Sequence, residues 1–171
     1  MDHPRSAIRA AVRDRLAAAL PDLAARIYVQ RATPLVRERL PAIMIYARDE
    51  RIDEAYTADP GARRRVLTLA VEIVAAGRDA HDAADALAAA VESALEADET
   101  LGGLLEGSRL MRTEMEMDGD GETPIFACRL LIEAVYWTLW RQPDAGARPT
   151  LVLYSIAPEI GAAHVDRYRT L

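Results

Sequence analysis

Two runs with opposite gradients of polarity constrain the fold of this chain more than any other feature. Residues 42–56, AIMIYARDERIDEAY, begin apolar and become charged, and residues 63–76, RRRVLTLAVEIVAA, reverse that order. The stretch between them contains Asp-Pro-Gly at 59–61, which favours a turn. The pattern predicts a long antiparallel hairpin with its base in the core and its charged tip in solvent. One face of the second strand is expected to carry Leu67, Leu69, Val71 and Ile73.

A second pair of runs predicts another hairpin. Residues 109–118, RLMRTEMEMD, alternate polar and apolar side chains, with Met111, Met115 and Met117 expected to pack under a helix. Residues 125–140, IFACRLLIEAVYWTLW, are apolar on both faces, as in a central strand. Leu131 is expected to be a core residue of this strand, so that Leu131→Asp would unfold the domain.

The connecting stretch MEMDGDGETP resembles the start of a calcium loop, but the spacing is wrong. With Asp118 at position 1, Thr123 occupies position 6, where a glycine is needed for the sharp turn. Arg129 occupies position 12, where the ion needs a bidentate glutamate. The acidic residues are therefore interpreted as an exposed turn rather than as a metal site.

Two amphipathic helices are predicted, at residues 4–20 and 79–98. Residues 25–31 indicate a short strand, and Thr33-Pro34 either cap one helical turn through Arg39 or begin a loop. The expected fold class is α+β. It has an antiparallel-dominated sheet, allowing for a mixed one, of about five strands. Two amphipathic helices pack on one face, with a projecting β-hairpin and a C-terminal arm.

A change in composition after Trp140 indicates the end of the main domain. Residues 1–141 are expected to form the α+β domain, and residues 142–171 a linker followed by a docking arm. The arm contains the apolar stretch TLVLYSI, and its candidate contact residues are Leu151, Leu153, Tyr154 and Ile156.

The composition gives no sign of an enzyme or of a nucleic-acid-binding protein. The net charge is −6, which would repel phosphate rather than hold it. Cys128, the only cysteine, lies in an apolar run and is expected to be buried and inert. The three histidines lack metal-ligand spacing and are expected at the surface, and none of the common catalytic motifs is present. No apolar run approaches the ~18 residues of a membrane helix, so we expect a soluble cytosolic product without cofactor or metal.

The basic run at 63–65 is the most concentrated charge feature and has two interpretations. It either forms ion pairs with acidic residues of the facing strand or contacts an acidic partner surface or DNA. The candidate interface residues on the two strands are Arg48, Asp49, Glu50, Arg51, Asp53, Glu54, Arg63, Arg64 and Arg65.

The order of these segments resembles that of the tail terminator, or tail completion, proteins of tailed bacteriophages, similar to the minor tail protein U family. The matching segments are IRAAVRDRLAAALP, RIYVQRATPLVRERLPAIMIYARDE, VLTLAVEIVAAG, DALAAAVESALEADETLGGL and MRTEMEMDGDGETPIFACRLLIEAVYWT. Together they cover about residues 5–140. The resemblance depends on the succession of segments and on phrases such as LPAIMIY and TLGGL rather than on catalytic residues.

The resemblance implies a non-enzymatic virion protein of the tail or neck, assembled in the host cytoplasm. Such proteins form a homo-oligomeric ring, typically a hexamer, that caps the tail tube, stops its polymerisation and contacts a head-side connector protein. DNA would pass through the ring without specific binding, and no membrane is involved. The hairpin at about 48–65 would contribute subunit or tube contacts, and the 110–140 hairpin would supply sheet. The alternatives are a head completion or neck connector protein, or a small-molecule-binding α+β domain.

Overall fold

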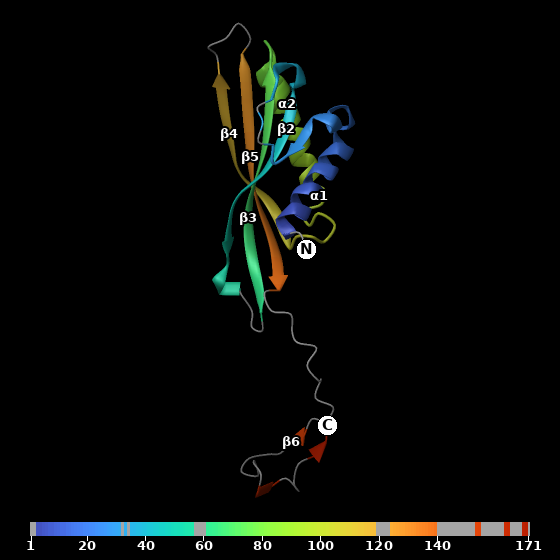
Figure 1. The fold of residues 1–171 in the computed structure, drawn as a ribbon, viewed down its shortest axis with the longest axis vertical. Helices are drawn as coiled ribbons and strands as arrows, with labels where there is room; N and C mark the ends of the chain where they lie inside the picture. Colours follow the sequence, from blue (N-terminus) through green and yellow to red (C-terminus); the bar gives the residue numbers. More distant parts are fainter. Residues whose placement is uncertain are drawn as a thin grey trace. The chain divides into compact units, whose positions relative to one another are not determined.

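The computed structural model describes residues 3–31, 33, 35–56, 61–118, 124–139, 153–154, 163–164 and 169–170. The chain divides into two units, Met1–Trp140 and Arg141–Leu171. The first unit contains both α-helices and the larger sheet (Figure 1). In the second unit β6 (Leu153–Tyr154) pairs antiparallel with β7 (Arg169–Thr170).

Helix α1 (Pro4–Ala19) begins at a proline and buries one row of side chains. Proline suits this position because the first helical N–H groups have no partner within the helix. The His3 imidazole accepts a hydrogen bond from the Arg5 backbone N–H at 3.3 Å. The buried row recurs at every fourth residue and consists of Ile8, Val12 and Leu16.

The segment after α1 leads to the edge of the sheet. The 3₁₀ helix η1 (Pro21–Arg26) is followed by β1 (Ile27–Val29), which confirms the short strand expected there. A 3₁₀ turn, η2 (Arg37–Arg39), is observed in the following residues, but its N-cap is Val36, so Thr33 does not cap it. The peptide bond between Leu40 and Pro41 is cis, immediately before the next strand.

The first predicted hairpin is confirmed as β2 (Ala42–Ile52) and β3 (Ala62–Ala76), which pair antiparallel. Ile43 lies opposite Ile73 and Ile52 lies opposite Arg65, so the apolar ends of the strands coincide, as do their charged ends. Arg48 is an extra residue in β2, where the register shifts between Ala47 and Asp49. The turn at 57–60 lies outside the described residues.

The second hairpin is confirmed as β4 (Gly107–Asp118) and β5 (Ile125–Leu139). Helix α2 (Ala80–Glu96) connects β3 to β4. β5 also pairs with the whole of β3, from Ala76 opposite Ile125 to Ala62 opposite Leu139. The turn at 119–123, which holds the acidic residues considered as a metal site, lies outside the described residues.

The five strands form one mixed sheet in the order β1-β2-β3-β5-β4. β1 is parallel to β2, and every other neighbouring pair is antiparallel. Helix α1 lies on the β1–β2 half and α2 on the β3–β5 half, both on the same face (Figure 1). The α+β fold class with two helices on one face of a mostly antiparallel sheet is therefore confirmed.

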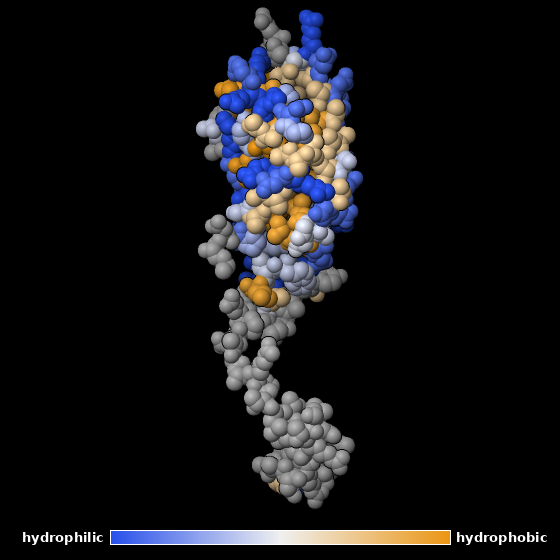
Figure 2. Space-filling model, turned by 90° about the vertical axis from the view of Figure 1, so that its right-hand side faces the viewer, coloured by the Kyte–Doolittle hydropathy of each residue, from blue (hydrophilic) through white to orange (hydrophobic). Residues whose placement is uncertain are grey.

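Alternation in β5 separates a buried face from an open face. In β5 the even-numbered side chains from Phe126 to Tyr136 are buried under the helices. In β3 the predicted set is buried, with Leu67, Leu69, Val71 and Ile73 at most 1% exposed, and Val66, Ala70 and Ala75 are buried as well. Cys128 is also buried, as expected. The outward sides of the two helices are rich in alanine, so Figure 2 shows pale orange patches between blue charged side chains.

The opposite face of the sheet carries charged side chains that pair across strands. Arg129 of β5 bonds Glu72 of β3 at 2.9 Å and Glu114 of β4 at 3.2 Å. Glu114 also pairs with Arg112. This ladder joins three neighbouring strands on the face without helices.

Two expectations about the second hairpin are wrong. Met111, Met115 and Met117 do not pack under a helix, because β4 is the edge strand and their exposed fractions are 54%, 63% and 68%. Leu131 is only half-buried on the open face, whereas its neighbour Leu130 is fully buried.

Candidate protein-interaction surfaces

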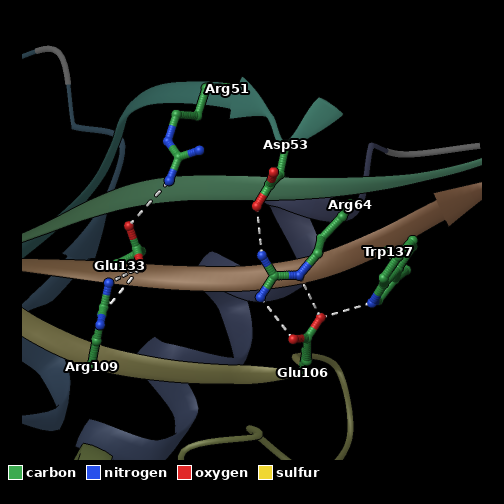
Figure 3. A network of polar contacts seen from close by, with 7 residues as sticks. All are labelled: Arg51, Asp53, Arg64, Glu106, Arg109, Glu133 and Trp137. Carbon is green, nitrogen blue, oxygen red and sulfur yellow. Dashed lines mark hydrogen bonds and ion pairs between the residues drawn. The ribbon is translucent and has the colours of Figure 1, made fainter. Parts of the chain in front are cut away.

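The charged end of the β2–β3 hairpin is held by a network of ion pairs on the open face of the sheet (Figure 3). The Arg64 guanidinium donates to Asp53 at 2.7 Å and to both carboxylate oxygens of Glu106, at 2.9 and 2.7 Å. The Trp137 indole N–H donates to the same Glu106 carboxylate at 2.8 Å. The residue after β2 and the residue before β4 are thereby joined to β3 and β5 at one end of the sheet.

A second group in the same network lies on β2, β4 and β5. Glu133 accepts from Arg109 at 2.8 Å and lies 3.7 Å from Arg51 (Figure 3). The hydrogen bonds from Arg64 lower the pKa of Glu106, and the bonds to Glu106 and Asp53 raise the pKa of Arg64. Both shifts favour the ionised forms of Glu106 and Arg64, so this pair is a charged cross-brace at neutral pH.

On the helix-covered face, the same end of the hairpin contains a carboxylate that is nearly removed from solvent. The Glu50 side chain is 9% exposed, and it accepts hydrogen bonds from Arg65 and from the Tyr136 hydroxyl. Arg65 also donates to Thr138 at 2.8 Å, and Arg5 of α1 lies 4.0 Å from Glu50. These contacts fix the hairpin to β5 and to the start of α1.

Burial and hydrogen bonding act in opposite directions on Glu50. Burial alone would raise the pKa of its carboxyl group, but the hydrogen bonds from Tyr136 and Arg65 and the nearby arginine charges lower the pKa below the usual value. Burial and the bond to Glu50 raise the pKa of the Tyr136 hydroxyl. Glu50 is therefore a charged structural contact at neutral pH, and Tyr136 is its neutral donor.

Three large apolar side chains are exposed at this end of the sheet. Ile52, Trp137 and Leu139 are 41%, 44% and 67% exposed. Their registers place them at the same end of the sheet but on its two faces: Ile52 is opposite Arg65 on the helix-covered face, whereas Trp137 and Leu139 are opposite Arg64 and Ala62 on the open face. We call these three residues the hairpin-end surface. A rigid strand end with exposed apolar side chains is suited to contact with another protein.

The structure brings together most of the candidate interface residues predicted from the sequence, and it pairs several of them with one another. Arg65 pairs with Glu50 and Arg64 with Asp53, each on the facing strand, as the first of the two interpretations expected. Asp49 and Glu54 are exposed, Arg48 is exposed at the bulge, and Arg51 reaches Glu133. A role for these residues in subunit or tube contacts stays a prediction.

For the candidate arm contacts, the structure describes only part of the segment. Leu153 and Tyr154 form β6, which pairs with β7 of the same segment. Leu151 and Ile156 lie outside the described residues. Docking of the arm on its own domain or on a neighbour also stays a prediction.

A groove between α2 and β4 was not found from the sequence. It is lined by Leu110 of β4, by Leu130 and Ile132 of β5 and by the α2 side, including Glu92, Leu95, Glu96 and Glu99. In the sequence, the only trace of this groove was the helical spacing of acidic residues within 79–98. The sequence pattern did not show that β4 would lie beside α2, so it did not show that these residues would line a groove.

Neither a metal cluster nor a membrane helix is found in the described part of the chain. None of its helices is long and apolar enough to cross a membrane. Its histidine, cysteine and acidic side chains form no group of three or more that could hold a metal ion.

Comparison with known proteins adds little to this picture. No protein-family model matches the chain, and no curated protein matches it. One similar chain among solved structures belongs to a particle described as "Virion of native gene transfer agent (GTA) particle". The two chains are 16% identical, the match covers 74% of this chain and 93% of that chain, and the TM-score is 0.42. Similarity at this level carries no argument about function.

Proposed function

We propose that this protein is a structural subunit of a phage-type virion, which forms a ring at the head-proximal end of a tail tube. The ring would stop tube polymerisation and provide the surface that joins the tail to the head. The sequence resemblance over about residues 5–140 suggests this role, and the α+β fold with its braced hairpin is compatible with it. The alternatives of a neck connector and of a ligand-binding domain have no specific observation in their favour.

The observation that carries the proposal is the hairpin-end surface. Ile52 is exposed on the helix-covered face and Trp137 and Leu139 on the open face of one end of the sheet, which is cross-braced by Arg64 on the open face and by Glu50 on the other. Ordering the strand end before binding lowers the entropic cost of an interface. The proposed partner of this surface is the last ring of tail tube subunits.

The test is a variant that removes the apolar contacts but leaves the ion-pair network intact. Ile52→Ser with Leu139→Ser does this, because neither side chain belongs to the braced groups. We expect a folded protein that no longer caps tubes when mixed with tail tube subunits, as seen by negative-stain electron microscopy. The matched control is Val36→Ser, which changes a 56% exposed apolar residue before the opposite end of β2 and should cap normally.

Capping by the double variant at wild-type efficiency would remove the hairpin-end surface from the proposed function. Wild-type protein that binds head-side connectors but leaves tubes uncapped would favour the neck connector alternative. Thermal unfolding of both variants, followed by circular dichroism, separates a binding defect from a folding defect.

A further inference from the structure

Charge is distributed unevenly between the two edges of the sheet. Residues 3–39, which include α1 and the edge strand β1, contain eight arginines and three acidic residues. Residues 79–118, which include α2 and the other edge strand β4, contain eleven acidic residues and two arginines. Because β1 and β4 are the first and last strands of the sheet, the two sets of charges lie on opposite sides of one molecule.

The basic side is ordered by the geometry of α1. Arg5, Arg9 and Arg13 recur at four-residue steps and therefore lie in one row along the helix. This row faces away from α2, since Arg15, from another part of the helix surface, donates to the Ala94 carbonyl of α2 at 2.9 Å. Arg5 and Arg13 side chains are 42% and 48% exposed, although Arg5 lies 4.0 Å from Glu50 and Arg13 pairs with Asp14 at 2.6 Å. We call Arg5, Arg9 and Arg13 the basic flank.

The acidic side is formed by α2, which carries Glu92 and Glu96, and by the turn after it, which carries Glu99. Glu92, Glu96 and Glu99 follow one another at steps of four and three residues and line the groove against Leu110 of β4. Among the described residues, no arginine lies within ion-pair distance of these three carboxylates. We call Glu92, Glu96 and Glu99 the acidic flank.

Apolar side chains continue this surface along β4. Met115 and Met117 lie opposite Cys128 and Phe126, which are buried under the helices, so both methionines point to the helix-covered side. They are nevertheless 63% and 68% exposed, because β4 lies beyond the cover of α2. Leu110 beside the groove is 38% exposed. Methionine side chains adapt readily to the shape of a partner.

We propose that the acidic flank and the β4 methionines of one copy receive the basic flank of a second copy of this chain. A second copy is the expected partner because its basic flank, at the opposite edge of the sheet, has the charge complementary to the acidic flank. Contact between unlike surfaces is heterologous, so each copy keeps one flank free for the next copy, and the series closes if the rotation between copies allows it. This inference deepens the ring proposed above, and it assigns the two surfaces that would join neighbouring subunits.

Charge reversal in separate copies tests the proposal. One variant carries Glu96→Arg with Glu99→Arg, and the other carries Arg9→Glu with Arg13→Glu. We expect each variant alone to sediment as a monomer at low salt, at concentrations where wild type forms oligomers. An equimolar mixture should restore oligomers, because in an alternating series the reversed flank of one variant meets the reversed flank of the other, and the two unchanged flanks meet as in wild type. Added salt should weaken the wild-type oligomer, since exposed charges are screened over about 8–10 Å near physiological ionic strength.

Two further variants keep the test decisive if a reversal impairs folding. The neutral pairs Glu96→Gln with Glu99→Gln and Arg9→Gln with Arg13→Gln should each weaken self-association, and their mixture should give no rescue. The control Asp82→Arg changes a 93% exposed charge of α2 outside the groove and should associate like wild type.

A wild-type protein that remains monomeric at every concentration and salt, or a mixture of reversed variants without oligomers, would overturn the proposal. The tube-capping assay separates this outcome from failure of the proposed function. Capped tubes without rescue on mixing would reject only these two flanks. Rescue on mixing with uncapped tubes would retain the flanks and reject the tail terminator role.

Discussion

The structure assigns Glu50 a different role from the one that the sequence predicted. In the sequence it is one of several charges on a strand that was expected to project into solvent. In the structure its side chain is 9% exposed and bonded by Arg65 and Tyr136, while the adjacent Asp49 is exposed. Neighbouring residues of a strand point to opposite faces, so one position of register decides which of the two carboxylates is buried.

This difference gives a prediction for Glu50→Gln. The substitution should lower the free energy of unfolding at neutral pH by about 2 kcal/mol, because charged hydrogen bonds are replaced by weaker ones. Since the folded-state pKa of Glu50 lies below 4.5, its stabilisation is present above pH 4.5 and is lost as the pH falls through the folded-state pKa. The difference between wild type and variant in urea unfolding should therefore shrink in acid.

The matched control is Asp49→Asn, one residue away on the exposed side. It should change the free energy of unfolding little at any pH, because the Asp49 side chain is exposed. Equal losses for the two substitutions at neutral pH would contradict the structural role assigned to Glu50.

At the scale of elements, the hairpins and helices could be read from the sequence because their periodicity was strong. The mirrored gradients predicted β2 and β3, and four-residue spacing predicted α1 and α2. The position of β4 could not be read, because alternation tells which residues share a face but not whether a neighbour covers that face. The methionines were therefore assigned to the core although β4 is an edge strand.

The same limit applied to β5, where both faces are apolar and the pattern favours neither. The structure buries Leu130 completely and leaves Leu131 half-buried on the open face. Leu130→Ala should therefore lower the free energy of unfolding by about 2–5 kcal/mol, and Leu131→Ala by clearly less. Leu130→Asp should prevent folding, whereas Leu131→Asp should leave a cooperative unfolding transition.

Circular dichroism with thermal melting would compare these four variants directly. A larger loss for Leu131→Ala than for Leu130→Ala would show that the open face of the sheet is buried in the folded protein, by a partner copy or by the C-terminal segment. Measuring the melting temperature at several protein concentrations would distinguish these two sources, because only burial by a partner depends on concentration.

For the whole molecule, the candidate site could be predicted only in part. The cluster of charges on the first hairpin was found from the sequence, but the structure uses Arg64 and Arg65 to brace the strand ends internally. The surfaces that remain for partners are the hairpin-end surface and the two flanks. They combine residues far apart in sequence: the strand order places Ile52 and Leu139 at the same end of the sheet and Glu92 beside Leu110 at the groove.

The central claim is that the protein stops the growth of a tail tube, and tube length tests it most directly. Tail tube subunits would be polymerised with increasing amounts of this protein, and tube lengths and ends would be recorded by negative-stain electron microscopy. The account predicts tubes that become shorter as the protein is added, each ending in a ring. Tubes of unchanged length without a ring at either end would contradict it.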